Sequence, residues 1–242
     1  MIKVPYFVIQ LIRKTKGLFF LLKLHYLIPH KIIETISGLA KLSKWISKHK
    51  KGLDSDYYTF KWNYDKRYDL YSNIYESEGL DDEVDYIELG VSMGYSFRWW
   101  VDKIKNSKAK FYGFDTFTGL PEDWGSFKKG DMSNGNEIPD IKDSRVELFQ
   151  GLFQQKIPEF LENYSPNKRR IILFDADLFS STIYGLTALN SIIKKGDILF
   201  FDEFNVPLHE FKAFTVWAES YYINYEVLGA RNNFYAVAIK IL

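Results

Sequence analysis

The sequence contains no cysteine, which excludes disulfide bonds, thiolate zinc sites, iron–sulfur clusters and cysteine nucleophiles. The four histidines show no H-x-x-x-H spacing, so a zincin-type metalloprotease is not indicated. A G-x-x-x-x-G-K-[ST] motif is also missing, which disfavours a P-loop nucleotidase. Long hydrophobic runs are scarce. The longest uncharged stretch near the N-terminus, residues 4–12, is far shorter than the roughly 20 residues that span a bilayer, and no signal-peptide cleavage site follows it.

The composition indicates one globular domain with an extension. The chain has 242 residues, of which 46% are hydrophobic and 18% aromatic, enough for a large core. Its charge is unevenly divided. Residues 1–52 hold 11 Lys/Arg and one Glu, a net charge of +10, whereas residues 53–242 carry a net charge of −9. Because the main part is acidic, a nucleic-acid partner is not expected.

The N-terminal extension is basic and apolar, and Pro29 divides it. Beyond Pro29, apolar residues such as Ile32, Ile36 and Leu39 recur at helical spacing between lysines. One interpretation is an amphipathic helix that makes peripheral contact with an anionic membrane. The other is a helix that packs on the main domain or on a second copy in a homo-oligomer. The expected location is the cytoplasm, with any membrane contact at the inner face.

From about residue 53, strand-like and helix-like segments alternate, which predicts an α/β fold built on a mostly parallel sheet. Two closing strands around a short turn predict an antiparallel hairpin at the C-terminal edge. The predicted strands are 84–89, 110–115, 145–149, 169–175, 197–202, 225–230 and 234–241. The predicted helices are 96–104, 153–163, 181–194 and 209–222.

Ligands of such sheets bind beyond the carboxyl ends of the strands. The first predicted strand ends in ELGVSMGYS (residues 88–96), where Gly90 and Gly94 allow a tight turn and close approach to a ligand. The next strand ends in Asp115, 25 residues after Gly90, near the offset at which a carboxylate binds a nucleoside ribose. With Glu88 adding a further negative charge, a cationic nucleoside cofactor such as S-adenosylmethionine is favoured over a phosphate-rich one.

Acidic residues also follow two later strands. Asp175 and Asp177 come after the fourth strand, and Asp202 and Glu203 come after the fifth. If these strands are neighbours, Asp175, Asp202 and Glu203 converge, and a hard cation such as Mg²⁺ would relieve their repulsion. The alternative is a structural role, in which Asp177 or Ser180 caps the following helix.

Two further segments are candidates for covering the site. The connection 116–144 is long and rich in glycine, which is typical of a lid; Trp124 and Phe127 could cover a sugar ring, and the alternative is a plain surface loop. Aromatic residues before the first strand either extend this cover or pack in the core, namely Tyr57, Tyr58, Phe60, Trp62 and Tyr64.

The segments ELGVSMGYS, FYGFDTFTGLPEDW, DADLFSST and GDILFFDEF together resemble the macrocin O-methyltransferase family over roughly residues 80–242. The resemblance implies a Rossmann-like class I methyltransferase sheet, which makes residues 53–242 the S-adenosylmethionine-dependent methyltransferase domain. Residues 1–52, which the resemblance does not cover, are expected to form a helical extension. It implies methylation of a hydroxyl on a sugar, a glycan or a glycosylated natural product. One departure is the pair Asp202-Glu203, where the family commonly has Asp-Asp.

The resemblance also implies a role for individual residues. The cofactor would be bound by Glu88, Gly90, Ser92, Gly94, Ser96 and Asp115. Mg²⁺ would be held by Asp175, Asp202 and Glu203, and Asp177 would be the general base beside Asp175, with His209 as a rival base. Two alternatives remain: metal-free methylation of a non-sugar small molecule, and a non-catalytic scaffold with a methyltransferase fold.

Overall fold

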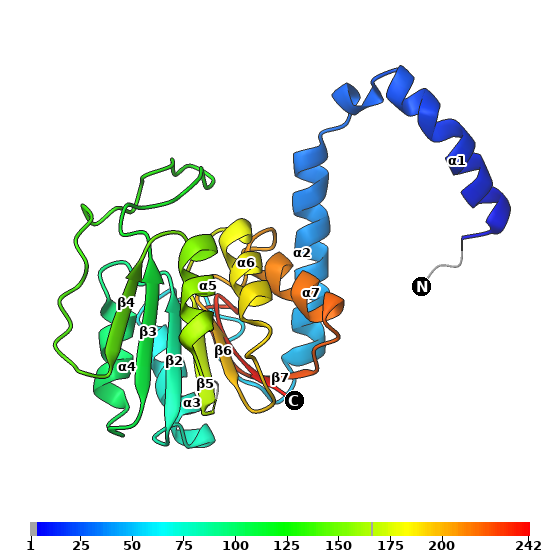
Figure 1. Ribbon diagram of the computed structural model, residues 1–242. Coiled ribbons are helices and arrows are strands. Elements are labelled where there is room, and N and C mark those ends of the chain that lie inside the picture. The colour runs from blue at the N-terminus through cyan, green and yellow to red at the C-terminus, as the bar shows by residue number, and fades with distance from the viewer. Residues whose placement is uncertain (1–3, 166) are drawn as a thin grey trace.

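The computed structural model describes residues 4–165 and 167–242 (Figure 1). An eight-stranded sheet lies at its centre, in the order β1-β7-β8-β6-β5-β2-β3-β4. The strands are β1 (Asp54–Ser55), β2 (Val84–Leu89), β3 (Lys110–Asp115), β4 (Val146–Gln150), β5 (Arg169–Phe174), β6 (Ile198–Phe201), β7 (Tyr225–Arg231) and β8 (Ala236–Ile241). The helices are α1 (Tyr6–Leu21), the short 3-10 helix η1 (Leu24–Leu27), α2 (His30–His49), α3 (Lys66–Glu78), α4 (Tyr95–Lys103), α5 (Phe153–Asn163), α6 (Phe179–Leu189) and α7 (Glu210–Ser220).

Within this sheet, β8 is antiparallel to both of its neighbours, β6 and β7, and every other described pairing is parallel. The predicted parallel sheet with a C-terminal antiparallel hairpin is therefore confirmed. The outermost strand on that side is β1, however, which pairs with β7 through Asp54 and Gly229.

Helices cover both faces of the sheet, which explains why every residue of β2 is buried. Successive side chains of a strand point to opposite faces. Ile87 therefore joins the core cluster that includes residues of α5, α6 and α7, while Tyr86 joins the cluster that includes residues of α3 and α4. The two apolar layers fix the sheet, and with it the positions of the strand ends.

The chain reverses direction across the sheet at β2. It runs outward from β2 through β3 to β4 and then returns to β5 on the other side of β2. In open α/β sheets, such a reversal leaves a crevice at the carboxyl ends of the strands. The pairing of β5 with β6 places Phe174 opposite Phe201, so Asp175 and Asp202 directly follow paired residues, as the sequence predicts.

Two helices differ from the sequence prediction. Helix α3 was not predicted, although it buries Leu70, Tyr71 and Ile74 against the sheet, because tyrosines and charged residues interrupt its apolar pattern. Helix α6 ends at Leu189 rather than continuing to residue 194. The pattern failed there because the apolar residue Ile192 is buried in a turn that follows the helix.

The N-terminal helices extend away from this domain (Figure 1). In α2 the buried residues are Gly38, Leu42 and Trp45, which lie from the middle of the helix toward its C-terminal end, and Trp45 packs against the ring of Phe204 at 4.9 Å. Neither α1 nor η1 contains a buried residue. Among the described residues, 4–165 and 167–242, we find no helix with the length and apolar character needed to cross a membrane.

Candidate active site

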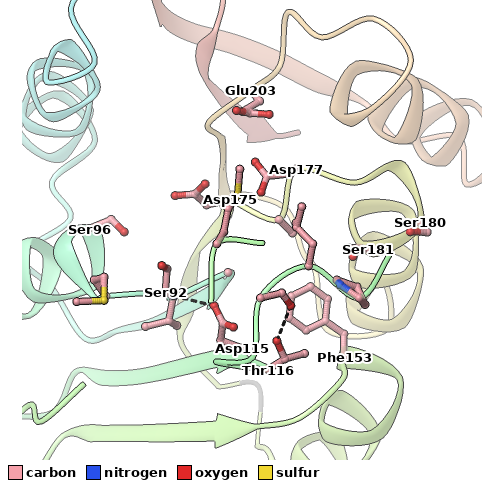
Figure 2. A pocket seen from close by; sticks show the side chains of 18 of the residues that line it. Ser92, Ser96, Asp115, Thr116, Phe153, Asp175, Asp177, Ser180, Ser181 and Glu203 are labelled. Carbon is pink, nitrogen blue, oxygen red and sulfur yellow. Dashed lines mark hydrogen bonds between the residues drawn. The ribbon is translucent and has the colours of Figure 1, made fainter. Parts of the chain in front are cut away.

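A cavity of about 650 Å³ opens at the carboxyl ends of β2, β3, β5 and β6 (Figure 2). This volume is within the usual range for a small-molecule site. The sequence-predicted site residues that line it are Gly90, Ser92, Ser96, Asp115, Asp175, Asp177 and Glu203. Three others lie just outside its lining, namely Glu88, Gly94 and Asp202. The predicted residues thus come from four strand ends and gather around one cavity.

The loop after β2 reaches this cavity because it contains glycine. Gly90 has a φ of +103°, and a Cβ atom there would lie 1.8 Å from the carbonyl oxygen of Asp175. Only glycine allows both the backbone angle and this close approach. Gly94, with a φ of +76°, forms the N-cap of α4 and turns the chain into the helix. The loop backbone therefore faces the cavity directly, as a bound nucleoside requires.

Glu88 lies behind this loop and is fully buried. Its Oε1 atom accepts a 2.6 Å hydrogen bond from the Ser96 hydroxyl, and its Oε2 accepts one from Tyr86. Burial raises the pKa of Glu88 to about 8, an effect that these two hydrogen bonds reduce only in part. Ser96 lines the cavity, so Glu88 acts on the site by fixing Ser96 at the start of α4.

Asp115 connects the end of β3 to the glycine loop. Its Oδ2 accepts a 2.7 Å hydrogen bond from the Ser92 amide, and its Oδ1 accepts one of the same length from the Phe117 amide (Figure 2). A carboxylate has about four acceptor positions, so two remain free to accept ribose hydroxyls. The position, orientation and free acceptors of Asp115 fit the ribose-binding role predicted for it.

The opposite side of the cavity is acidic. Figure 2 shows Asp175, Asp177 and Glu203 gathered there. Burial, together with the neighbouring Asp202 and Asp177 carboxylates, raises the pKa of Asp175 well above its usual range. Burial and the adjacent Glu203 carboxyl raise the pKa of Asp177 to about 8. Side chains with pKa values near neutrality in a cavity are suited to proton transfer.

Asp177 and Glu203 lie close enough to influence each other's pKa. Burial and then the Glu203 carboxyl raise the pKa of Asp177, and Glu203 Oε2 has no hydrogen-bond partner among the described residues. A hydrogen bond between the two carboxyls would require one of them to carry a proton. Glu203 is oriented by the Tyr235 hydroxyl, which donates to its Oε1. Asp177 itself has a φ of +58° and does not cap α6.

The one cation of this cluster is Arg67, which the sequence analysis did not single out. Its Nη1 atom lies 3.0 Å from Oδ2 of Asp202 and 3.6 Å from Oδ2 of Asp175. The Tyr64 hydroxyl donates a 2.6 Å hydrogen bond to the same Oδ2 of Asp202, and the Tyr64 ring lies 3.9 Å from the guanidinium carbon. Tyr64 and Arg67 both line the cavity, so the end of the segment before α3 and the first turn of α3 supply part of its wall.

The predicted Mg²⁺ site is not confirmed. Asp202 faces Arg67 and Tyr64, and Glu203 faces Tyr235 and Asp177, so the expected ligands do not converge on one point. Within residues 4–165 and 167–242, no group of three acidic or histidine side chains is arranged to hold a metal ion. A guanidinium instead lies between two of the predicted ligands, where it offsets their negative charge.

Three other expectations about this region are wrong in detail. Ser180 does not cap α6; its hydroxyl donates a 2.6 Å hydrogen bond to Glu122. His209 does not line the cavity, and burial lowers its pKa. Trp124 and Phe127 stack on each other at 5.3 Å rather than lining the cavity. The cavity residues that segment 116–144 supplies are Thr116, Gly119, Leu120, Pro121, Glu122 and Met132.

The aromatic segment before α3 supplies one residue to the cavity and none to the core, since Tyr57, Tyr58, Phe60, Trp62 and Tyr64 are all exposed. Tyr64 lines the cavity, whereas Trp62 packs edge-on against the ring of Tyr235 at 4.6 Å. Phe60 is 90% exposed and belongs to neither the cavity nor the core. Tyr235, which also lines the cavity, was not predicted, because nothing in the spacing of the closing hairpin marks it.

Comparison with known proteins agrees with this geometry. Residues 87–204 match the model of a methyltransferase domain family. The fold is similar to that of CalS11, a calicheamicin methyltransferase, with 18% identity, a TM-score of 0.55, and coverage of 86% of this chain and 92% of that chain. It is also similar to the O-methyltransferase NovP, with 16% identity, a TM-score of 0.55, and coverage of 73% and 79% respectively. No curated protein matches the chain.

A second structure of CalS11, described as a TDP-rhamnose 3'-O-methyltransferase, has 19% identity and a TM-score of 0.51, and covers 86% of this chain and 94% of that chain. At such identities the likeness shows the fold. The chain has the Rossmann-like fold of class I methyltransferases, and its methyltransferase domain match runs from β2 to just past β6. The narrower resemblance to macrocin O-methyltransferases stays a prediction.

Proposed function

We propose that this protein is an S-adenosylmethionine-dependent O-methyltransferase that methylates a hydroxyl group of a sugar or of a glycosylated compound. One observation carries the proposal. The glycine loop with Asp115 and the acidic group of Asp175, Asp177 and Glu203 line the same cavity. A nucleoside-binding half and a proton-accepting half thus meet in one space, which transfer of a methyl group to a hydroxyl requires.

The chain's own residues fit the cofactor. The backbone of Gly90 and Ser92 faces the cavity, and Asp115 has acceptor positions available for ribose hydroxyls. The acidic lining attracts a sulfonium cation, whereas it would repel a phosphate-rich cofactor. When bound, S-adenosylmethionine supplies an electrophilic methyl group. Everything else in the reaction is alignment of the acceptor and removal of its proton.

Asp177 is the proposed general base. It lines the cavity, and its pKa of about 8 keeps a useful fraction ionised near neutral pH while making the carboxylate a stronger base. In its ionised form it takes the proton of the acceptor hydroxyl. Burial and the neighbouring Glu203 carboxyl favour protonation of Asp177 during that step, and Asp175 lines the same part of the cavity. Glu203 and the Tyr235 hydroxyl bonded to it complete the polar wall against which the acceptor would lie.

Arg67 is the proposed source of positive charge in this half of the cavity. It contacts Asp202 and approaches Asp175, so it offsets part of the repulsion among four buried acids. The Mg²⁺ expected from the sequence forms no part of this proposal, because its three ligands are directed elsewhere. A sugar acceptor is supported by the printed description of CalS11 as a TDP-rhamnose 3'-O-methyltransferase and by the hydroxyl-rich wall of Tyr64 and Tyr235.

Calorimetry with S-adenosylmethionine and its demethylated product tests the cofactor half of the proposal. We expect binding by the unaltered chain and a loss of at least about tenfold in affinity in Asp115→Ala, which removes the acceptor of the ribose hydroxyls. Absence of binding at millimolar cofactor would favour the scaffold alternative and overturn the proposal.

Transfer of a labelled methyl group to a panel of acceptors tests the second half. The panel contains nucleotide-linked sugars and phenols, and the label is followed into the product. We expect transfer to a sugar hydroxyl, abolished in Asp177→Asn while cofactor binding persists. Transfer to phenols alone would leave the methyltransferase assignment intact and reject the sugar acceptor.

A further inference from the structure

Residues 4–28, which comprise α1 and η1, form a surface that no other part of residues 29–165 and 167–242 covers. No residue of either helix is buried. Figure 1 shows α1 reaching away from the sheet and the helices that cover it. Large apolar side chains are exposed along the whole segment, among them Tyr6, Phe7, Leu11, Ile12, Leu18, Phe20, Leu21, Tyr26 and Leu27. A surface this apolar is unusual in water and marks an interaction site.

Two of the three cations of α1 lie opposite an apolar side of the helix. With 3.6 residues per turn, Phe7, Leu11 and Leu18 project from one side of α1. Arg13 and Lys16 project from the opposite side, whereas Lys14 lies beside Leu18 on the apolar side. A helix in a membrane interface places its apolar side toward the acyl chains and its cations among the headgroups, which the long side chain of a lysine can reach from the edge of the apolar side.

The charge of the segment selects the kind of membrane. Six Lys/Arg residues come before Glu34, the first acidic residue of the chain. With no internal acid to offset them, these cations complement the negative surface of an anionic bilayer. Pairing with the same segment of a second copy would bring like charges together, which disfavours that partner.

Helix α2, which follows residues 4–28, is packed on the main domain. From the middle of α2 onward the helix is held against the domain: Gly38 lies against Leu208, and Trp45 donates a 2.9 Å hydrogen bond to the Tyr225 hydroxyl. An ion pair of 2.8 Å joins Lys212 of α7 to Glu34 of α2. The first half of α2 continues the exposed apolar surface through Ile32, Ile33, Ile36 and Leu39. Helix α2 therefore fixes α1 to the domain while leaving it free to meet another surface.

We propose that residues 4–28 dock this protein on an anionic membrane surface, with α1 lying in the interface rather than crossing it. The 16 residues of α1 span about 24 Å, less than the ~30 Å hydrocarbon core, and three cations interrupt its apolar character. The docking is independent of the reaction proposed above, since none of these residues lines the cavity.

Flotation of the full chain with vesicles tests this proposal. One set contains phosphatidylcholine alone, and the other contains phosphatidylcholine with phosphatidylglycerol. We expect flotation with the second set and little with the first, and a marked decrease as salt is raised, since screening weakens attraction to the surface. Equal flotation with both vesicle sets, or flotation that does not change with salt, would overturn the proposed attraction to an anionic surface.

Matched variants distinguish vesicle binding through residues 4–28 from nonspecific binding by the rest of the protein. Phe7→Ser with Leu11→Ser removes two exposed apolar groups, and Arg13→Glu with Lys14→Glu reverses two charges. Each is expected to reduce the bound fraction at least about tenfold, because the first removes apolar groups that would enter the bilayer and the second replaces attraction to anionic headgroups with repulsion. The controls are Tyr222→Ser, a residue 89% exposed on the main domain, and Lys195→Glu, an exposed cation before β6; both are expected to bind like the unaltered chain.

The oligomeric state distinguishes the competing partner. Light scattering during gel filtration gives the mass of the unaltered chain and of the Phe7→Ser, Leu11→Ser variant. If the unaltered chain does not float with either vesicle set but forms an oligomer that this variant converts to monomer, residues 4–28 bind a second copy and the proposal is overturned. Flotation with unchanged mass in both proteins supports the membrane.

Discussion

Arg67 and Asp202 form a buried ion pair at the rear of the cavity, with Nη1 of Arg67 3.0 Å from Oδ2 of Asp202. Both side chains are almost fully removed from solvent. The other carboxylate oxygen of Asp202, Oδ1, has no hydrogen-bond partner among the described residues. The pair is thus the main compensation for a charge that sits in a low-dielectric region among other acids.

Replacing Arg67 by methionine is expected to be strongly destabilising, because it leaves Asp202 buried without its cation. Loss of one partner of a buried pair typically costs about 3–5 kcal/mol. Arg67→Lys keeps the charge but loses the planar contact with the Tyr64 ring, and is expected to cost less. Urea unfolding of the three proteins measures the difference. Equal stability of Arg67→Met and the unaltered chain would show that the pair is not important for folding.

Methyl transfer is expected to persist after treatment with a chelator. The predicted metal ligands Asp175 and Asp202 already face Arg67, and Glu203 faces Tyr235. The measurement is the rate in the presence of EDTA, with and without added Mg²⁺. A rate that falls on chelation and returns with Mg²⁺ would restore the metal role predicted from the sequence.

The rate is expected to rise with pH up to about 8 and then level off. Asp177 must be ionised to act as a base, and its pKa is raised to about 8, so each pH unit below that value lowers the rate about tenfold. Glu203→Gln removes the neighbouring carboxylate that helps to raise this pKa, so its profile should shift to lower pH. A profile that is flat from pH 5 to 9 would contradict the role of Asp177.

The buried Glu88 is expected to make the fold less stable at high pH. Its pKa in the folded protein is raised from an ordinary value of 4.5 to about 8. Its contribution to the free energy of unfolding is therefore fully present below about pH 4.5 and is lost as the pH rises through 8. Glu88→Gln keeps the shape without the titration, so its stability should fall less over this range. Chemical unfolding at several pH values compares the two.

Gly90→Ala is expected to abolish cofactor binding and to destabilise the fold by at least about 3 kcal/mol. The new Cβ would meet the Asp175 carbonyl oxygen at 1.8 Å, a backbone atom that has no room to move away. Gly130→Ala is the matched control. Its φ of +90° is similar, but nothing lies within 4 Å of the new Cβ, so it should cost only the backbone strain. Thermal unfolding and calorimetry measure both effects.

The sequence predicted the glycine-loop side of the cavity better than its acidic side. Gly90 and Asp115 directly follow strands with a clear apolar pattern, and the rule for parallel sheets places such residues together. Arg67 and Tyr235 come from segments far apart in the chain, and they meet Asp202 and Glu203 only through the completed sheet. The sequence shows that acidic residues follow these strands, but it does not show how their side chains are oriented. Those orientations depend on hydrogen bonds and ion pairs with Arg67, Tyr64 and Tyr235.

The pairing of β1 with β7 has a consequence for the order in which the protein matures. Asn233 bonds the backbone of Thr59 in both directions, at 2.9 and 2.8 Å, and the amide of Asn232 donates to the carbonyl of Asn63 at 2.8 Å. The segment that leads to Arg67 is therefore held in position by the hydrogen bonds of Asn232 and Asn233. On the ribosome Asn232 and Asn233 emerge after both Arg67 and the acids, so we expect Arg67 to take its place beside Asp202 only once residues 232 and 233 have been made.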